Sequence, residues 1–403
     1  MTETVHGDRA PGLRVHIYVQ HLLGRGHLAR MRTLAAALAR AGHRVTLISG
    51  GMSAAGDDGD AEVHAGYRVL QLPAVRVAAG NFRVLLGEDG AAVDDDFKAR
   101  RAAQLLQVVA DDAPQVLVVE SFPFGRRAMR FELLPLMEMV AAMQPRPLTL
   151  CSVRDILQPR DGARDRQTVA EVVQWFDAVL VHADPAVAKL EETFSLTEEL
   201  RGRFFYTGYV HESAGAAAGD ASPETPPAHG AVVVSAGGGA VGFELLKTAV
   251  AARPLSALKH RPWHLLVGRN AAAAEFDALV ECAGDGITVQ WARADFAALL
   301  AACAVSVSQA GYNTALDTAA AGCGAVFVPY SRHGESEQLR RAEKFAALGR
   351  AVTVAEEDLN AASLASAIDR AARLDLSACA PIRMDGAAQT LAFIEREHRA
   401  RLN

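Results

Sequence analysis

The sequence lacks the features that mark membrane-spanning or exported proteins. No apolar run approaches the length that is needed to cross a bilayer. The first residues, 1–12, are polar and contain no apolar signal segment. These two absences predict a cytoplasmic protein and leave only peripheral membrane contact open.

Patterns typical of metal, disulfide and nucleic-acid binding are also missing. The five cysteines are scattered without a CxxC pair, so neither a zinc site nor a disulfide framework is expected. No cluster of His, Cys and acidic residues has the spacing of a metal site, and we expect no metal and no other cofactor. The formal net charge is −6 without a block of Lys and Arg, which argues against nucleic acid as a partner. The pairs Arg100–Arg101 and Arg126–Arg127 are interpreted as solvated helix faces.

What is present is a repeated alternation of strands and helices. A chain of 403 residues is long enough for two domains. Strand 13–19, helix 28–41 and strand 44–49 form a βαβ unit, which requires a parallel sheet. Further strands are expected at 116–119, 148–153 and 178–182.

The alternation breaks once and then restarts. Residues 212–230 are rich in Ala, Gly, Pro and Ser, a composition that cannot pack a core. After this break we expect strands at 231–235, 263–267, 287–290, 305–308 and 325–329, and helices at 243–252 and 385–399. The fold class is therefore α/β, with two Rossmann-like domains whose parallel sheets face a central cleft. The predicted boundaries are 1–210 and 231–380 for the domains, 211–230 for the linker and 381–403 for a C-terminal helix.

The segment SQAGYNTALD, residues 308–317, follows a strand and opens a helix. A helix N-terminus presents free N–H groups and a positive dipole end, which suits a phosphate. Gly311 permits close approach of the backbone, and Asn313 and Thr314 supply donors or N-capping oxygens. Asp317 stands one turn further on, where its carboxylate would accept both hydroxyls of a ribose. An ordinary helix cap with a turn glycine is the alternative.

Two further loops belong to the same half of the chain. Residues 329–338 follow the next strand and end in Glu337 and Gln338, an acid and an amide suited to sugar hydroxyls. The loop SAGGGAVG, residues 235–242, lies between a strand and a helix, where backbone N–H groups form an anion nest. Its candidate diphosphate contacts are Ser235, Gly237, Gly238 and Gly239.

The third glycine-rich loop, GRGHLAR, occupies residues 24–30 in the first half. Its GxGxxA spacing resembles a dinucleotide fingerprint, but the second strand ends without the acid that holds an adenosine ribose, which disfavours a nicotinamide cofactor. Gly24, Gly26 and Arg30 are expected on the acceptor side of the cleft. His27 is a candidate general base, although a histidine that only caps the helix gives the same pattern.

Other strand ends carry further candidates. Glu120 follows a strand and faces the same cleft, so it is an alternative base. The pair Arg154 and Asp155 follows another strand. Surface or interdomain salt bridges explain these three residues almost as well.

These motifs together resemble a known enzyme class. QAGYNTALD is similar to the HCGWNSxxE core of the donor motif in nucleotide-sugar glycosyltransferases, with Gln309 where His or Arg is usual. The whole chain resembles the GT-B glycosyltransferases of the lipid II N-acetylglucosaminyltransferase group. By this resemblance Asn313 and Thr314 would contact the diphosphate, Asp317 the ribose, and Glu337 and Gln338 the transferred sugar.

The resemblance implies a metal-independent, inverting transfer of a sugar from a nucleoside diphosphate sugar to an acceptor. Uridine diphosphate with N-acetylglucosamine or another hexose is favoured as donor, and the acceptor is a small or lipid-linked molecule that cannot be identified. Residues Gly26, His27 and Arg30 also resemble the GHxxR loop of a nucleotide-sugar hydrolase in nonulosonic acid synthesis. A hydrolase or epimerase is therefore the nearest alternative, and a non-catalytic nucleotide-sugar binding protein is the second.

Overall fold

The structure is a computed structural model of the chain. It describes residues 12–22, 26–52, 63–64, 66–78, 81–158, 161–211, 229–236, 242–269, 271–293, 295–330 and 336–402.

The first half forms an eight-stranded sheet in the order β10-β9-β8-β7-β1-β2-β4-β3. All neighbouring pairs are parallel except β3 and β4. The strands are β1 (Arg14–Val19), β2 (Arg44–Ser49), β3 (Val63–His64), β4 (Tyr67–Gln71), β7 (Val116–Glu120), β8 (Leu148–Arg154), β9 (Ala178–His182) and β10 (Phe204–Tyr206). The central strands β1, β7, β8 and β9 are buried along almost their whole length, as expected of parallel strands covered on both faces.

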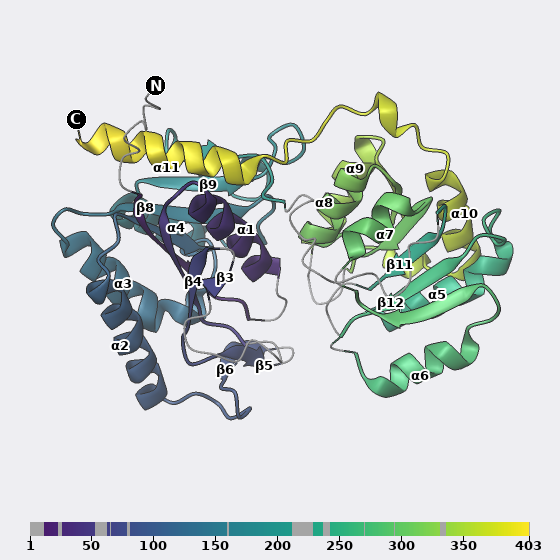
Figure 1. Cartoon of the computed structure of the whole chain (residues 1–403), viewed down its shortest axis with the longest axis horizontal. Helices are drawn as coiled ribbons and strands as arrows, with labels where there is room; N and C mark the ends of the chain where they lie inside the picture. The colour runs from purple at the N-terminus through teal and green to yellow at the C-terminus, as the bar shows by residue number, and fades with distance from the viewer. Residues whose placement is uncertain are drawn as a thin grey trace, which may run out of the picture.

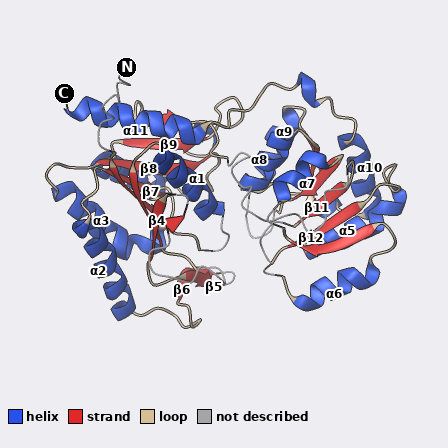
Figure 2. Ribbon diagram, viewed as in Figure 1, coloured by secondary structure: helices blue, strands red, loops and turns tan. Residues whose placement is uncertain are grey.

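Helices cover this first sheet on both faces (Figures 1 and 2). They are α1 (Gly26–Arg40), α2 (Asp95–Asp111), α3 (Arg130–Ala142) and α4 (Gly162–Trp175). The side chains of Asp94 and Asp161 cap α2 and α4 by accepting a backbone N–H from the first turn. A separate antiparallel ribbon pairs β5 (Arg76–Ala78) with β6 (Asn81–Leu86).

The second half forms a six-stranded, wholly parallel sheet in the order β13-β12-β11-β14-β15-β16. Its strands are β11 (Val232–Ser235), β12 (Trp263–Val267), β13 (Ile287–Trp291), β14 (Val305–Ser308), β15 (Gly324–Phe327) and β16 (Ala351–Thr353). Its helices are α5 (Phe243–Ala252), α6 (Ala273–Cys282), α7 (Phe296–Ala302), α8 (Tyr312–Ala321), α9 (Glu337–Ala347) and α10 (Ala361–Ala371). The strand order is that of a Rossmann dinucleotide-binding sheet.

The chain crosses between the two halves twice, and the crossings lie side by side. Tyr209 donates its N–H to the carbonyl of Arg383 at 2.8 Å, and Gly386 donates back to Tyr209 at 3.0 Å. After the second crossing, helix α11 (Gly386–Leu402) lies across the first half (Figure 1). The rings of Phe393 and Phe205 are 4.6 Å apart there, so the C-terminal helix is a structural part of the N-terminal domain.

The fold class expected from the sequence is confirmed. Strands 44–49, 178–182, 263–267 and 305–308 and helix 243–252 have the predicted limits, and the others differ by a few residues at their ends. Helix α1 begins at Gly26 rather than at residue 28, which places His27 in its first turn. Within the described ranges no helix combines the length and the apolarity that are needed to cross a membrane.

Candidate functional site

Each sheet has one point where the strand order reverses, and ligands of such folds bind at these points. In the N-terminal sheet the reversal lies at β1, whose neighbours are β2 and β7. His27 lies in the first turn of α1, the next element after β1, and Glu120 is the last residue of β7. In the C-terminal sheet the reversal lies at β11, between β12 and β14, where Ser235 and Ser308 end their strands.

Glu120 is the centre of the N-terminal cluster. Its carboxylate is fully buried at the end of β7. Oxygen Oε1 accepts from Nδ1 of His27 at 2.5 Å, from Nη2 of Arg30 at 2.6 Å and from Oγ of Ser121 at 2.6 Å. The other oxygen, Oε2, has one long contact of 3.4 Å with Nη2 of Arg126. Three positively charged or hydrogen-bonding side chains therefore converge on one carboxylate oxygen.

The loop that follows Glu120 has an unusual backbone. Ser121 and Arg126 both adopt positive φ angles, 64° and 58°, outside glycine. Left-handed conformations of such residues are uncommon and cost on the order of 1–3 kcal/mol, and they gather at functional sites. Here they turn two polar side chains toward the same buried carboxylate.

The two candidate bases have different protonation behaviour. Burial opposes ionisation of Glu120, but His27 and the two nearby arginines outweigh it and hold the pKa of this carboxyl well below its usual range. Burial lowers the pKa of His27 to about 3, although Glu120 opposes that shift. The pair is therefore a carboxylate that accepts the Nδ1 proton of a neutral imidazole. The His27 side chain is 21% exposed and Glu120 is not exposed at all, so only the imidazole is open to a ligand.

The first turn of helix α8, in the second half of the chain, lies against this cluster across the domain interface. Gly26 faces Asn313 so closely that a Cβ on Gly26 would lie 3.3 Å from the amide nitrogen of Asn313. The guanidinium of Arg30 lies over the ring of Tyr312, 5.3 Å from its centre. The N-termini of α1 and α8 thus face each other, with glycine in α1 where the approach is tightest.

The predicted donor residues occupy the start of α8 and the strand ends beside it. Asn313 and Thr314 are half-buried in the first turn of α8, Gln309 is half-buried just before it, and Gly311 is its N-cap. Asp317 is one turn further on, and its Oδ1 contacts Nε2 of His211 at 2.9 Å. That contact holds the carboxylate in place at the crossing between the domains.

Two serine hydroxyls lie unpartnered at the C-terminal switch point. Ser235 and Ser308 stand opposite each other in the register of β11 and β14. Both Oγ atoms are buried and have no hydrogen-bond partner among the described residues. Buried hydroxyls are nearly always satisfied, so the two atoms have unused hydrogen-bonding capacity at this point.

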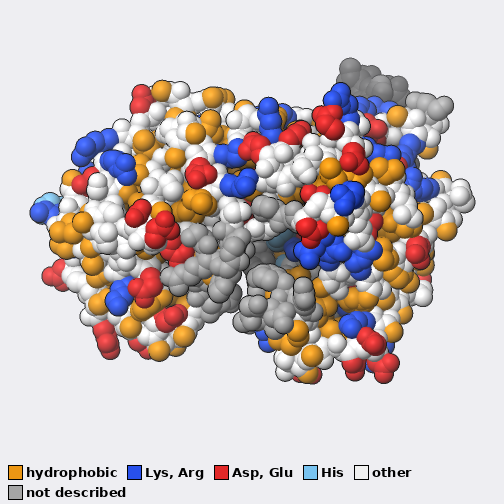
Figure 3. All heavy atoms as spheres, turned by 180° about the vertical axis from the view of Figure 1, so that it is seen from behind, with side chains coloured by type: hydrophobic (Ala, Val, Ile, Leu, Met, Phe, Trp, Pro, Cys, Tyr) orange, Lys and Arg blue, Asp and Glu red, His pale blue; other side chains and the backbone are white. Residues whose placement is uncertain are grey.

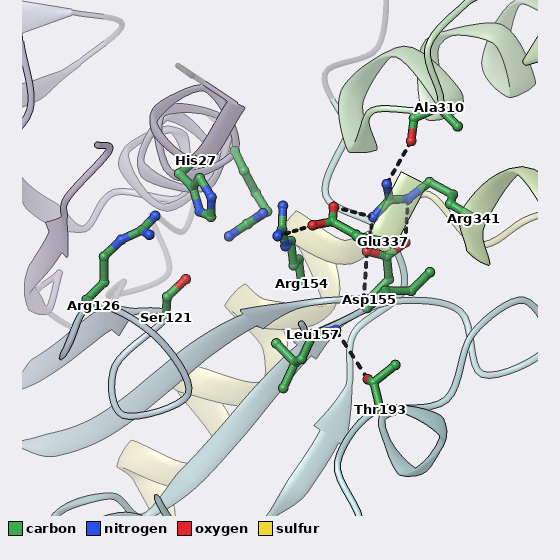
Figure 4. A network of polar contacts seen from close by, with 12 residues as sticks. His27, Ser121, Arg126, Arg154, Asp155, Leu157, Thr193, Ala310, Glu337 and Arg341 are labelled. Atoms are coloured by element: carbon green, nitrogen blue, oxygen red, sulfur yellow. Dashed lines mark hydrogen bonds and ion pairs between the residues drawn. The ribbon is translucent and has the colours of Figure 1, made fainter. Parts of the chain in front are cut away.

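Glu337, a predicted sugar contact, belongs to a salt-bridge network between the domains (Figure 4). Glu337 is buried at the start of α9 and pairs with Arg154 from the N-terminal domain and with Arg341 at 2.9 Å. Arg341 also binds both oxygens of Asp155, at 2.7 and 2.9 Å. The neighbouring Gln338 accepts a backbone N–H from Tyr330 at 3.0 Å. The side chains proposed to bind the sugar thus both have protein partners.

Other predicted residues are placed as follows. Gly24, Gly237, Gly238 and Gly239 lie outside the described residues. The interpretation of the two arginine pairs as solvated faces is wrong for Arg101, which is fully buried. It is also wrong for Arg126, whose side chain is only 14% exposed, while Arg127 is exposed. The left-handed backbone at Arg126 separates the two side chains, and no sequence pattern signals such a turn. His211 and Arg341 were missed because their partners Asp317 and Asp155 are 106 and 186 positions away. Ser121 is adjacent to its partner Glu120, and its role depends on its left-handed backbone, which the sequence does not signal.

Comparison with known proteins agrees with this architecture. Residues 232–395 match the family model of the glycosyltransferase family 28 C-terminal domain. No curated protein is a sequence match.

Several solved structures share the fold of almost the whole chain. MurG of Acinetobacter baumannii is 13% identical with a TM-score of 0.56, covering 95% of this chain and 99% of that one. The glycosyltransferase SnogD of Streptomyces nogalater is 18% identical with a TM-score of 0.56, covering 96% and 99%. A UDP-glucosyltransferase of Polygonum tinctorium is 13% identical with a TM-score of 0.60, covering 97% and 94%. The predicted GT-B fold is confirmed, and the family-model match supports the predicted glycosyltransferase class of enzyme.

Proposed function

We propose that this chain is a metal-independent, inverting glycosyltransferase that uses a nucleoside diphosphate sugar as donor. Uridine diphosphate linked to N-acetylglucosamine or another hexose is the favoured donor, by the resemblance of the donor motif. The observation that carries the proposal is the placement of a neutral, partly exposed imidazole opposite the N-terminus of α8. A base and an anion-binding helix end therefore face one another across the domain interface.

The donor is assigned to the C-terminal half. The first turn of α8 offers free backbone N–H groups and a positive dipole end to the diphosphate. The unpartnered hydroxyls of Ser235 and Ser308 lie at the adjacent strand ends. Asp317 would bind the ribose hydroxyls in place of His211. Glu337 would exchange Arg154 for the sugar hydroxyls, and Gln338 would contact the same sugar.

His27 is proposed as the general base and Glu120 as its positioning residue. The Nδ1 proton is held by Glu120, so the lone pair of Nε2 is free to take the proton of an acceptor hydroxyl. The acceptor oxygen then bonds to the anomeric carbon while the bond from that carbon to the diphosphate oxygen breaks. The leaving diphosphate carries the developing charge, which the α8 N-terminus stabilises.

Binding of the donor is tested by Asp317→Ala. Uridine diphosphate is expected to raise the melting temperature of the wild type, because a ligand that binds only the folded state stabilises it. Loss of charge-assisted hydrogen bonds to the ribose should weaken binding by about tenfold or more, as calorimetry would measure. Equal affinity of Asp317→Ala and wild type would remove the proposed ribose contact.

The hydrolase alternative uses the same cleft with water as acceptor. Incubation of the protein with the nucleotide-sugar alone separates the two. Rapid stoichiometric release of free sugar and nucleoside diphosphate without an acceptor would favour the hydrolase. Tight binding without any turnover, unchanged in His27→Ala, would favour a non-catalytic binding protein.

A further inference from the structure

Arg126 differs from Arg101 and Arg341, two other deeply buried arginines of this chain. Arg101 binds both oxygens of Glu132, at 2.6 and 3.0 Å, and Arg341 binds both oxygens of Asp155. These carboxylates outweigh burial and raise the pKa of each guanidinium. The structure thus shows how this chain satisfies a buried guanidinium when its role is structural.

Arg126 has no such carboxylate of its own. Its contact with Glu120 is a single one of 3.4 Å, to a carboxylate that already binds His27 and Arg30 more closely. Its Nε is buried and has no partner within the described part of the chain. Burial lowers the pKa of Arg126, and the neighbouring Arg154 and Arg30 lower it further, against the opposing effect of Glu120. The positive charge of Arg126 is therefore buried with only one distant carboxylate to balance it.

The position of Arg126 is imposed by the backbone. Its left-handed conformation, φ 58° and ψ 30°, directly precedes the short helix η1 (Arg127–Met129). The side chain points toward His27, with Arg154 on the other side of the imidazole (Figure 4). Strained backbone conformations gather at binding and active sites. Here the strained residue places an incompletely paired guanidinium beside the candidate base, as a binding site would.

The charge balance around His27 is positive. Arg30, Arg126, Arg154 and Arg341 face the three carboxylates Glu120, Asp155 and Glu337. One guanidinium therefore remains without a carboxylate, in a protein whose formal net charge is −6. Lys and Arg side chains also gather beside the hollow between the two halves in the rear view (Figure 3). A positive cleft in an acidic protein favours an anionic ligand.

We propose that Arg126 binds an anionic group, a phosphate or a carboxylate, of the glycosyl acceptor beside the hydroxyl that His27 deprotonates. The inference rests on the proposed function, because it uses the assignment of the acceptor to the N-terminal side. Arg126 belongs to the loop after β7, and its ion pair is with Glu120 of the same domain. The donor diphosphate has its own site at α8. The planar guanidinium, with Nε and an Nη nitrogen on one edge, binds two oxygens of one phosphate or carboxylate.

The test uses the full-length protein with inorganic phosphate as the probe, while saturating uridine diphosphate fills the donor site. Phosphate binding is followed by isothermal titration calorimetry or by phosphorus NMR. Arg126→Gln should weaken phosphate binding by at least about tenfold, the effect of one charge-assisted hydrogen bond. Arg126→Lys should retain part of it. Equal phosphate affinity of Arg126→Gln and wild type, or no phosphate binding to the wild type, would overturn the proposal.

Arg127→Gln is the matched control. Arg127 is adjacent in sequence but exposed, and it donates to Gln167 at 2.8 Å. This variant should bind phosphate as the wild type does. The melting temperature of each variant shows that it is folded. If Arg126 only holds Glu120, Arg126→Gln will change the pH dependence of turnover without changing phosphate affinity, which would also overturn the proposal.

A second arm identifies the source of the anion. Uridine diphosphate glucose and uridine diphosphate glucuronate differ by one carboxylate on the sugar. Unchanged affinity for both donors in Arg126→Gln supports the acceptor as the source of the anion. An equal loss of affinity for both donors would assign the anion to the donor diphosphate and contradict the proposal. A loss confined to the glucuronate would assign the anion to the donor sugar and contradict the proposal. Failure of wild type to bind any nucleoside diphosphate defeats the proposed function, and this result is separate from the phosphate result.

Discussion

Two buried carboxylates follow neighbouring strands of the N-terminal sheet, and they have different surroundings. Glu120 ends β7 and Asp155 directly follows β8. Both are fully buried, and both have a pKa below the usual range because positive partners outweigh burial. The partners of Glu120 come from its own domain and include a partly exposed imidazole. Asp155 instead is bound on both oxygens by Arg341 of the other domain.

Both carboxylates are buried and charged, so neither property distinguishes a reactive cluster from a structural one. The distinguishing property is the number of hydrogen-bonding groups that the cluster leaves unused. Arg341 makes four hydrogen bonds, to Asp155 twice, to Glu337 and to the carbonyl of Ala310. Its donors are nearly used up, and the pair joins the domains. The cluster around Glu120 retains an open imidazole nitrogen and an unpartnered guanidinium nitrogen.

The largest effect should follow from removal of the open imidazole. His27→Ala is expected to lower the rate of glycosyl transfer by about 10²–10⁴-fold, the contribution of a positioned general base. Its affinity for the nucleoside diphosphate should stay within about twofold of wild type, since the donor site is in the other domain. A rate loss under tenfold would show that His27 is a structural residue and that the Glu120 cluster is not the reactive one.

Disruption of the Asp155–Arg341 ion pair should lower the free energy of unfolding. Arg341→Met leaves Asp155 buried without its main partner, which typically costs about 3–5 kcal/mol of unfolding free energy. The double variant Asp155→Leu, Arg341→Met should recover much of that loss, because both charges are then removed. Urea unfolding of the single and double variants measures the coupling. Equal destabilisation by the single and double variants would show that the ion pair has no special role.

The smallest expected effect is the dependence of the rate on pH. Because burial lowers the pKa of His27 to about 3, the imidazole is already neutral at every pH above about 4. Turnover should therefore change less than about twofold between pH 7.5 and 5.5, whereas a histidine of ordinary pKa would lose about tenfold over that range. A stopped assay of nucleoside diphosphate release checks this. An acid limb centred near pH 6.5 would show that the burial of His27 is relieved in the working enzyme.

The local part of this architecture was predictable from the sequence. Apolar β-branched runs bounded by glycine and polar residues gave the strands, and the parallel βαβ connection placed their carboxyl ends at one edge. This placement predicts that His27 and Glu120 face the same cleft, although they are 93 positions apart. In the structure, Nδ1 of His27 lies 2.5 Å from Oε1 of Glu120. The Rossmann-like order of both sheets follows from the same alternation.

The contacts between the domains were not predictable from these patterns. Asp155 and Arg341 are 186 positions apart, and their pairing depends on how two separate sheets dock. The burial of the Arg126 side chain depends on its left-handed backbone conformation, which no local sequence pattern predicts. The return of α11 to the N-terminal domain likewise depends on packing between Phe393 and Phe205.

The most direct test of the central claim is a reaction followed by proton NMR. Wild-type protein and His27→Ala are each incubated with uridine diphosphate N-acetylglucosamine and an extract of cellular acceptors, and the anomeric signals are recorded. An inverting transferase with His27 as its base forms a new β-glycoside from the α-linked donor, together with an equal amount of uridine diphosphate, in the wild type and not in His27→Ala. Retention of the α configuration, or free sugar as the only product, would contradict this mechanism.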